Sequence, residues 1–423
     1  MSDFKSLNLN PLILNTIKMK GYTAPTPIQT KTIPHLLKEN DVLGIAQTGT
    51  GKTASFSLPI IHRVLNIKNE LLPNQIHALI LAPTRELATQ IHKNIVSYSI
   101  GLDISSAAII GGVRKENQIE LMKKGIDIVV ATPGRLLDLI SGGHILLEKL
   151  EVFVLDEADM MLDMGFFKDV TTITKSLPAQ RQTVLFSATM PKEIESLAKN
   201  ILKNPVKIST AAQSSTIKNI AQQVYFVLED HKLPLLLMLL EDRKVEKVLV
   251  FCKAKYSVKS IVEALSENGI SNGEIHSNRT QSERNLAIKE FTDGNIRVLV
   301  ATDIASRGID VTNVTHVINF NMPEDATYYV HRIGRTGRAG KAGTAISLCA
   351  ERDLALLRNV KKLIKVDIPT IIDQPFHKEY KPLPKKGKHR PSRSSTRQKK
   401  KPSQAKVAAK KKFLESLESR QGV

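Results

Sequence analysis

Residues 150–159 read Leu-Glu-Val-Phe-Val-Leu-Asp-Glu-Ala-Asp. The first six of these residues have the composition of a buried strand, and the carboxylates begin where that strand ends. Acidic residues at the carboxyl end of a buried parallel strand lie over the crevice in which such sheets bind ligands, where they can hold a metal ion. Considered alone, the acidic string is equally compatible with a solvated helix start, so its meaning depends on the rest of the chain.

A second turn between a strand and a helix lies at residues 46–53, which read Ala-Gln-Thr-Gly-Thr-Gly-Lys-Thr. It matches the phosphate-loop pattern, except that Ala46 stands in the place of the first glycine. Gly49 and Gly51 would let backbone amides approach the phosphates, and Lys52 would contact the β- and γ-phosphates. A glycine-rich turn without a ligand is the weaker interpretation, because the lysine and the threonine are in register.

The two turns together predict binding and cleavage of a nucleoside triphosphate, with ATP and Mg²⁺ as the expected cofactors. Thr53 and Asp156 would hold the magnesium ion, Asp156 mainly through water. Glu157 would orient or deprotonate the attacking water. The loop residues expected to bind ATP are Gln47, Thr48, Gly49, Thr50, Gly51, Lys52 and Thr53.

Strand-forming runs alternate with amphipathic helical stretches, which predicts an α/β protein with parallel sheets covered by helices on both faces. The expected strands are 42–45, 77–82, 106–110, 126–131, 152–155 and 183–187, then 221–227, 247–251, 273–275, 296–301, 316–319 and 344–348. The expected helices are 53–65, 85–98, 191–201, 255–266, 281–291, 326–333 and 352–364. Periodicity is lost around 204–219. We therefore expect domains at 1–207 and 219–370, a linker at 208–218 and a tail at 371–423.

The tail carries much of the chain's positive charge. The formal net charge is +20, and residues 371–423 hold 16 Lys/Arg against 4 Asp/Glu, or +12. A basic tail of this kind usually contacts nucleic acid, although a merely solubilising tail is an alternative. Residues 381–405 contain almost no large apolar side chains, so we expect them to be disordered in isolation.

Composition also bounds the compartment. Cys252 and Cys349 lie in apolar runs, which favours buried thiols in a reducing cytoplasm over a disulfide framework. No stretch approaches the roughly 18–20 apolar residues that a membrane span needs. The first residues, 1–5, lack the basic and apolar regions of a secretory signal. A cytoplasmic protein with no membrane contact is therefore expected.

The second half carries an arginine-rich segment at 331–338, His-Arg-Ile-Gly-Arg-Thr-Gly-Arg. Arg335 and Arg338 are three apart, so both can face one direction. Arginines that reach a γ-phosphate from another domain would stabilise transition-state charge, an effect of roughly 10³–10⁵ in rate. A surface salt-bridge cluster is the alternative. Ser187-Ala188-Thr189 also follows a strand, and by itself it is best interpreted as the N-cap of the next helix.

Three further loops of the first half suit phosphate oxygens. Two of them place Thr and Arg where a strand turns into a helix, and the third, Gly111-Gly112, has bare backbone. ATP needs none of these loops, so they predict a nucleic-acid track with contacts to the sugar-phosphate backbone. Base stacking is not expected to be the main contact with nucleic acid, since aromatic residues make up only 4% of the sequence and Trp is absent. The expected contacts are Pro83, Thr84, Arg85, Gly111, Gly112, Thr132, Gly134 and Arg135.

Taken in order, these motifs resemble the DEAD-box family of ATP-dependent RNA helicases over roughly residues 4–368. Residues 21–29, Gly-Tyr-Thr-Ala-Pro-Thr-Pro-Ile-Gln, resemble the family's adenine-reading motif, and Phe4 matches its isolated upstream aromatic. Ala46 fits as well, since the family has Ala-Gln-Thr-Gly there. The short N-terminus and the sequence of residues 275–284 favour the bacterial RhlE-like subgroup. Ser277 departs from the family, whose members often have Gly at this position.

The resemblance implies two tandem RecA-like domains and further site residues. Phe4, Tyr22 and Gln29 would bind adenine, and Gly308 and Asp310 would approach the nucleotide. Gln281, Arg284 and Thr302 would touch RNA. The residues implied to couple hydrolysis to strand separation are Asp159, Ser187, Thr189, Asp303 and His331.

The function implied is an RNA-dependent ATPase. ATP and RNA would close the interdomain cleft together, locally unwinding short duplexes or remodelling RNA–protein complexes. A DNA translocase of the same superfamily and a non-catalytic RNA clamp or scaffold are the alternatives. Protein partners, the RNA and the oligomeric state are not predicted by the sequence.

Overall fold

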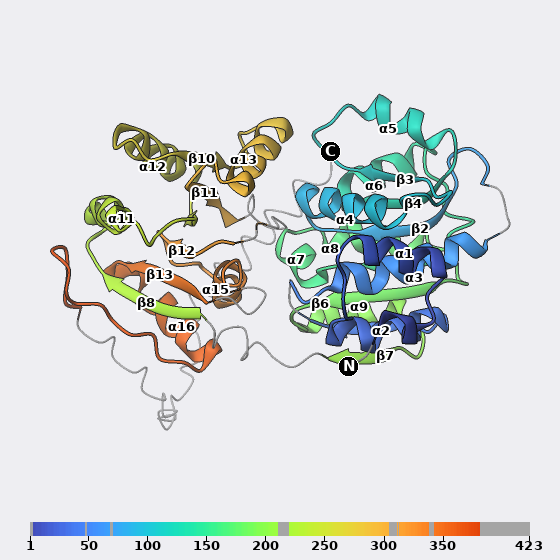
Figure 1. The fold of residues 1–423 in the computed structure, drawn as a ribbon, viewed down its shortest axis with the longest axis horizontal. Helices are drawn as coiled ribbons and strands as arrows, with labels where there is room; N and C mark the ends of the chain where they lie inside the picture. Colours follow the sequence, from blue (N-terminus) through green and yellow to red (C-terminus); the bar gives the residue numbers. More distant parts are fainter. Residues whose placement is uncertain are drawn as a thin grey trace, which may run out of the picture. The chain divides into compact units, whose positions relative to one another are not determined.

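The computed structural model describes residues 3–46, 49–67, 71–209, 220–303, 311, 313–337 and 342–380. Residues 1–380 belong to one compact body, which contains two parallel sheets with their helices (Figure 1). The tail from residue 381 onward lies outside the described residues, so its expected disorder stays a prediction. The predicted fold class, two parallel-sheet α/β domains, is confirmed.

The first domain is built on a sheet with the strand order β3-β4-β2-β5-β6-β1-β7 among the described residues, and each pair of neighbours is parallel. Side chains alternate between the two faces: Val152 and Val154 of β5 enter one core cluster, whereas Phe153 and Leu155 enter the other. The strands are β1 (Val42–Ile45), β2 (Ile76–Leu81), β3 (Ser106–Ile109), β4 (Ile126–Ala131), β5 (Val152–Leu155), β6 (Gln182–Ser187) and β7 (Val206–Ser209).

Two sets of helices cover the two faces of this sheet. One core cluster contains apolar residues from the first set, η1 (Phe4–Leu7), α1 (Pro11–Met19), α2 (Pro27–Leu37), α3 (Lys52–Asn66) and α4 (Arg85–Tyr98). The other contains apolar residues from α5 (Lys115–Met122), α6 (Pro133–Ser141), α7 (Ala158–Asp163), α8 (Phe167–Lys175) and α9 (Lys192–Ile201). Because both faces are covered, the inner strands β2, β5 and β6 are buried throughout, whereas burial alternates along the edge strands β3 and β7.

The second domain repeats this plan with the strand order β10-β11-β9-β12-β13-β8 among the described residues. Its strands are β8 (Ile220–Phe226), β9 (Val248–Cys252), β10 (Asn272–Ile275), β11 (Val298–Thr302), β12 (His316–Asn319) and β13 (Gly343–Cys349). Its helices are η2 (Glu229–His231), α11 (Lys232–Glu241), α12 (Lys255–Glu267), α13 (Gln281–Asp293), α15 (Ala326–Ile333), η3 (Glu351–Asp353) and α16 (Leu354–Ile364). Ligand-binding residues of such sheets follow the carboxyl ends of the strands.

The first expected domain boundary differs from the structure. Val206–Ser209 forms β7, which pairs in parallel with β1, so Ile208 and Ser209 lie in the sheet and not in a linker. Only Ile208 of this edge strand is buried, and two of its four residues are Lys and Ser, which explains why its pattern was too weak to predict. Residues 210–219 lie outside the described residues.

The second domain also continues past residue 370. The Ile371 amide donates to the Val224 carbonyl at 2.9 Å, and the Lys378 amide donates to the Phe226 carbonyl at 3.0 Å. The Tyr380 hydroxyl bonds the Val227 carbonyl at 2.9 Å. Residues 371–380 therefore lie along β8, because backbone hydrogen bonds and a few apolar side chains outweigh their polar composition.

Candidate nucleotide site and nucleic-acid groove

The phosphate loop joins β1 to α3. Gly51 precedes the helix with a φ of 94°, and Gly49 has a φ of 81°, conformations that favour glycine. Gln29 of α2 donates to the Gly51 carbonyl at 3.1 Å and accepts from the Thr26 amide at 2.9 Å. A Cβ at Gly51 would lie 2.6 Å from the Gln29 amide nitrogen, so glycine is needed for this close approach. Lys52 is the first residue of the helix, where backbone amides favour an anion.

Three buried side chains meet beside this loop. The Lys52 Nζ atom lies 3.6 Å from Asp156 Oδ1 and 3.9 Å from Glu157 Oε1. Within the described part of the chain, Lys52 Nζ, Asp156 Oδ1 and Glu157 Oε2 are buried without a hydrogen-bond partner. Glu157 also has a φ of 54°, an uncommon backbone conformation for a residue with a side chain. Such strain concentrates at functional sites.

The electrostatics of these side chains suit a phosphate and a divalent cation. Burial raises the pKa of the Asp156 carboxyl to about 6, and the Glu157 carboxylate adds to this effect while Lys52 opposes it. Burial acts to lower the pKa of Lys52, but the carboxylates of Asp156, Glu157 and Asp159 outweigh it, so the pKa is raised. Mg²⁺ is commonly held by one or two carboxylates together with substrate phosphates. The unpartnered atoms therefore fit a phosphate beside Lys52 and Mg²⁺ beside Asp156.

Ser187 and Thr189 lie against Asp159 and not at a helix start. Asp159 Oδ2 accepts hydrogen bonds from the Thr189 amide at 2.8 Å and from its hydroxyl at 2.9 Å. The Ser187 hydroxyl donates to the Thr189 carbonyl at 2.7 Å and accepts from the Asp159 amide at 3.3 Å. The next helix begins at Lys192, with Pro191 as its N-cap residue. The N-cap interpretation is therefore wrong, and these groups join the carboxyl ends of β5 and β6.

The residues expected to bind adenine form a small aromatic group. The Phe4 and Tyr22 rings are stacked with centroids 6.1 Å apart, and the Tyr22 and Tyr98 hydroxyls lie 2.9 Å apart. Phe4 is only 4% exposed and belongs to the core beneath α4. The structure therefore places Phe4 and Tyr22 together near the end of α4, while their contact with adenine stays a prediction.

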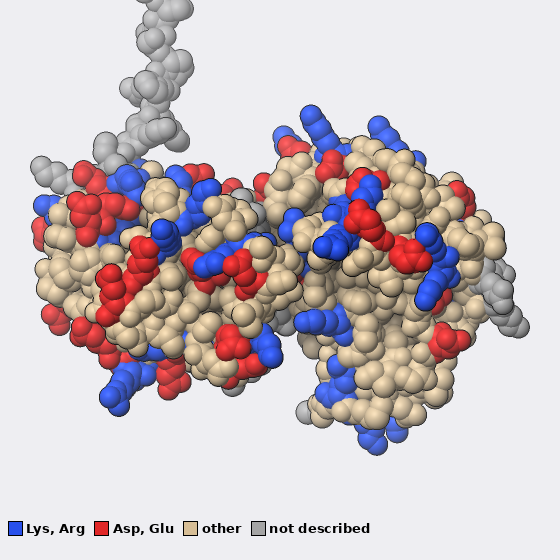
Figure 2. Space-filling view, turned by 90° about the horizontal axis from the view of Figure 1, so that it is seen from above, with Lys and Arg blue, Asp and Glu red and all other residues tan. Residues whose placement is uncertain are grey.

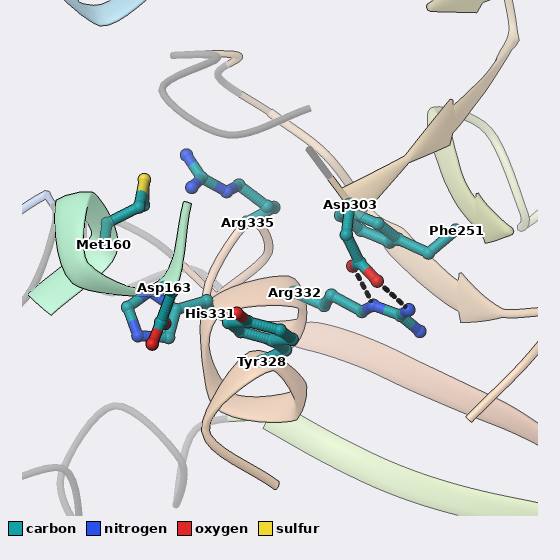
Figure 3. A pocket seen from close by; sticks show the side chains of 8 residues that line it. All are labelled: Met160, Asp163, Phe251, Asp303, Tyr328, His331, Arg332 and Arg335. Atoms are coloured by element: carbon teal, nitrogen blue, oxygen red, sulfur yellow. Dashed lines mark hydrogen bonds and ion pairs between the residues drawn. The ribbon is translucent and has the colours of Figure 1, made fainter. Parts of the chain in front are cut away.

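Arg335 lines a small pocket with side chains of α7, the helix that begins directly after Glu157 (Figure 3). Met160 and Asp163 come from α7, and His331 comes from α15. Figure 3 shows Arg335 extending toward Met160. The pocket thus brings two predicted residues of the second domain, Arg335 and His331, beside the helix that follows the acidic string.

Asp303 has a partner that the sequence did not predict. Its carboxylate accepts two hydrogen bonds from Arg332, at 2.6 Å each, and Arg332 also donates to the Asn319 side chain and the Asn321 carbonyl (Figure 3). The Arg332 guanidinium lies over the Phe251 ring, 5.1 Å from its centroid. Asp303 is therefore held rigidly at the end of β11.

The predicted RNA contacts gather in one groove of about 530 Å³. Its lining includes most of them, namely Pro83, Thr84, Arg85, Gly111, Thr132, Gly134, Arg135, Arg284 and Thr302. Cations predominate in this groove, whose lining has six Lys/Arg and one acidic residue. On the face of the molecule drawn in Figure 2, Lys and Arg are interspersed with Asp and Glu.

Arg85 explains the paired glycines. A Cβ on Gly112 would lie 2.1 Å from Arg85 Nη1, and a Cβ on Gly111 would lie 3.2 Å from Arg85 Nη2. Gly112 also has a φ of 79°. The two glycines therefore let the Arg85 guanidinium lie directly on the backbone at the groove wall, and Arg135 reaches the same loop through two bonds of 3.2 Å to the Val113 carbonyl.

Gln281 and Arg284 of α13 contact Glu86 of α4. Glu86 Oε1 accepts from Gln281 Nε2 at 2.8 Å and lies 2.9 Å from Arg284 Nη2. All three residues are buried. Glu86 was not predicted, since a glutamate in the first turn of a helix is favoured there in any case by the helix dipole.

The sequence also did not predict six further groove residues: Met164, Phe166, Lys253, Lys255, Ser277 and Arg279. Lys253 and Lys255 follow β9, whose proximity to Thr302 at the end of β11 depends on the strand order. A lysine directly after a predicted strand is the sequence signal that could have indicated these two groove residues. Five predicted residues, Gln47, Thr48, Gly308, Asp310 and Arg338, lie outside the described residues.

The fold and the site define a two-domain, RecA-like nucleotide-binding protein. The family description "DEAD/DEAH box helicase" matches residues 26–197, and "Helicase conserved C-terminal domain" matches residues 231–340. The chain is 42% identical to the DEAD-box ATP-dependent RNA helicase CshA of Geobacillus kaustophilus, over 86% of this chain and 77% of that protein. It is 42% identical to the ATP-dependent RNA helicase DeaD of Buchnera aphidicola, of which it spans only 61%.

Among solved structures, Dbp5 of S. cerevisiae bound to RNA and ADP BeF3 is similar with a TM-score of 0.80 and 30% identity, over 88% of this chain and 96% of that chain. The chain belongs to the DEAD-box family of ATP-dependent RNA helicases. These relatives do not decide the RhlE-like placement, which stays a prediction. Every helix among the described residues is too short or too polar to cross a membrane.

Proposed function

We propose that this protein is an RNA-dependent ATPase that locally unwinds short RNA duplexes or remodels RNA–protein complexes. The observation that carries the proposal is the buried group of Lys52, Asp156 and Glu157, whose polar atoms lack partners within the described residues. A cationic groove lies in the same body. The similarity to structures bound to RNA and a nucleotide supports the assignment of the two ligands.

In the nucleotide site, Lys52 would bind the β- and γ-phosphates, and Gln29 would hold Gly51 so that the loop keeps its shape. Thr53 and Asp156 would hold Mg²⁺, which neutralises phosphate charge when bound. Glu157 would orient the attacking water and accept its proton. Arg335 and Arg338 would stabilise the developing charge, so turnover would require the second domain.

In the groove, the cations would bind the sugar-phosphate backbone, which gives little dependence on sequence. Each ligand would favour the state in which the two domains are together, so each would tighten the binding of the other. The hydrogen bonds between Asp159 and Thr189 would transmit a movement of residues 156–159 to the loop that follows β6. The basic tail would raise the local concentration of RNA.

The two free cysteines, both buried, support a reducing compartment, and we propose a cytoplasmic location. The chemistry of the described groove assigns RNA as a partner. Dependence on Mg²⁺ is part of the same proposal and would be tested by chelation in the assay below.

Steady-state phosphate release tests the proposal. Purified protein would be assayed with ATP and Mg²⁺ in the absence of nucleic acid, with single-stranded RNA, and with DNA of matched sequence. We expect strong stimulation by RNA alone, and loss of turnover with retained ATP and RNA binding in Glu157→Gln. Equal stimulation by DNA would favour a DNA translocase, and an absence of hydrolysis under all conditions would favour a non-catalytic clamp.

A further inference from the structure

Tyr256 is an exposed aromatic side chain beside the groove. Its exposed fraction is 77%, and it is the single aromatic among the exposed large hydrophobic side chains of the described residues. The chain has few aromatic residues and no Trp. The other described Phe and Tyr side chains are buried or half-buried. A large exposed ring in such a protein is therefore a specific feature of this surface.

The ring stands next to residues that line the groove. Tyr256 is the second residue of α12 and follows directly on Lys255, which lines the groove together with Lys253 and Thr302. The Tyr256 hydroxyl also lies within electrostatic reach of the Lys253 ammonium group. Tyr256 itself is not among the lining residues, but it directly follows one of them, Lys255, and lies near another, Lys253.

The start of α12 favours a phosphate at the same place. Its N-cap residue is Ala254, whose side chain offers no acceptor for the first-turn amides. The amino end of a helix of 13 residues and the ammonium group of Lys255 attract an anion, whereas Lys253 is paired with Glu324 at 2.7 Å. A phosphate bound there would leave the attached base next to an aromatic ring.

We propose that Tyr256 stacks on one unpaired base of the RNA strand that occupies the groove. This inference rests on the proposed function. Stacking on an aromatic ring tolerates every base, since each base has a π-face. It requires a base that is splayed out of a duplex. Tyr256 would therefore add a contact that favours single-stranded over paired RNA, while the groove cations hold the backbone.

The first test measures the concentration of single-stranded RNA that gives half-maximal ATPase stimulation. Tyr256→Ala should raise it by about 5-fold or more, since base–aromatic stacking contributes roughly 1–3 kcal/mol per base. Tyr256→Phe should keep it within about 2-fold, because the ring is retained. Leu286→Ala is the matched control, since Leu286 is 59% exposed on α13 but does not line the groove. A half-saturation equal to wild type in Tyr256→Ala would overturn the inference.

The second test removes the base in place of the ring. On an abasic strand with the same phosphates, the difference between wild type and Tyr256→Ala should vanish, whereas the loss caused by Lys255→Ala should persist. An undiminished difference would show that the tyrosine does not act on a base. A wild-type protein that no RNA stimulates would instead contradict the proposed function.

The third test does not depend on turnover. Full-length protein would be photo-crosslinked to single-stranded RNA that contains 4-thiouridine, and the crosslinked residue would be mapped by mass spectrometry. A crosslink at Tyr256 is expected with single-stranded RNA, and it should weaken with a fully paired duplex. Crosslinks confined to other residues would overturn the inference even if ATPase activity behaves as proposed.

Discussion

Glu86→Gln should weaken the coupling between nucleotide and RNA binding. In the structure, Glu86 Oε1 accepts a hydrogen bond from Gln281 at 2.8 Å and pairs with Arg284 at 2.9 Å. The Glu86 and Arg284 side chains are 5% and 11% exposed, so water screens this pair poorly. Burial lowers the pKa of Arg284, and the Glu86 carboxylate opposes that effect.

The magnitude follows from the kind of bond that is changed. Hydrogen bonds to charged groups contribute roughly 1.5–3 kcal/mol. Glutamine keeps an acceptor oxygen but loses the charge, so we take about 2 kcal/mol as the loss, which corresponds to roughly 30-fold in an equilibrium constant. The bonds join α4 of the first domain to α13 of the second, so the loss falls on the state in which the domains are together.

The assay is the affinity for fluorescent single-stranded RNA with and without a non-hydrolysable ATP analogue. The ratio of the two dissociation constants is the coupling, and it should fall by roughly 30-fold in Glu86→Gln. Glu120→Gln is the control, since it removes a carboxylate from an exposed pair with Lys123, and such pairs contribute at most about 1 kcal/mol. A coupling within about 3-fold of wild type in Glu86→Gln would refute the reasoning.

Three further predictions concern the glycines, the thiols and the tail. Gly112→Ala should raise the RNA concentration for half-maximal ATPase stimulation, because the added Cβ displaces Arg85. The control is Gly143→Ala, which has a similar φ of 70° and open space around its Cβ, and which should only lower the thermal unfolding temperature. Equal RNA responses of the two variants would contradict this prediction. Burial raises the pKa of Cys252 and Cys349 to about 12 each, so at pH 8 only about 10⁻⁴ of each thiol is ionised. Iodoacetamide should therefore label both cysteines in urea and neither cysteine in the native protein. Rapid labelling of the native protein would contradict this prediction. Deleting residues 381–423 should raise the apparent KM for RNA more than it lowers kcat. It should also reduce the slope of log binding constant against log salt concentration by about 0.7 for each lost phosphate contact. An unchanged KM and an unchanged slope would show that the tail does not bind RNA.

The nucleotide-site residues could be predicted because each of them lies in one short turn between a strand and a helix, a pattern that is visible in the sequence. Asp156 follows directly on β5, and Gly51 and Lys52 end the turn that follows β1. Parallel sheets bring the carboxyl ends of their strands together. The strand and helix pattern likewise predicted both sheets to within a few residues at most boundaries.

Other features depend on which strands are neighbours, and the sequence does not state this. Lys253 and Thr302 line the same groove because β9 pairs with β11, a pairing between segments 50 residues apart. Ser187 and Thr189 had the composition of an N-cap, but the pairing of β5 with β6 placed Asp159 next to them. The Asp159 carboxylate accepts from both the amide and the hydroxyl of Thr189, and such charge-assisted hydrogen bonds are strong. The Ser187 hydroxyl donates to the Thr189 carbonyl.

Glu86 shows why a sequence motif can hide a second role. Its position after Arg85, in the first turn of α4, is one in which a carboxylate is stabilised by the helix dipole alone. The structure nevertheless buries this carboxylate and gives it two partners from α13, which a dipole effect would not require. Burying a charge is costly unless it is paired, so a glutamate retained there must be compensated by Arg284. Glu86 is thus placed to link α4, the helix that bears Arg85 of the groove, to the second domain through α13.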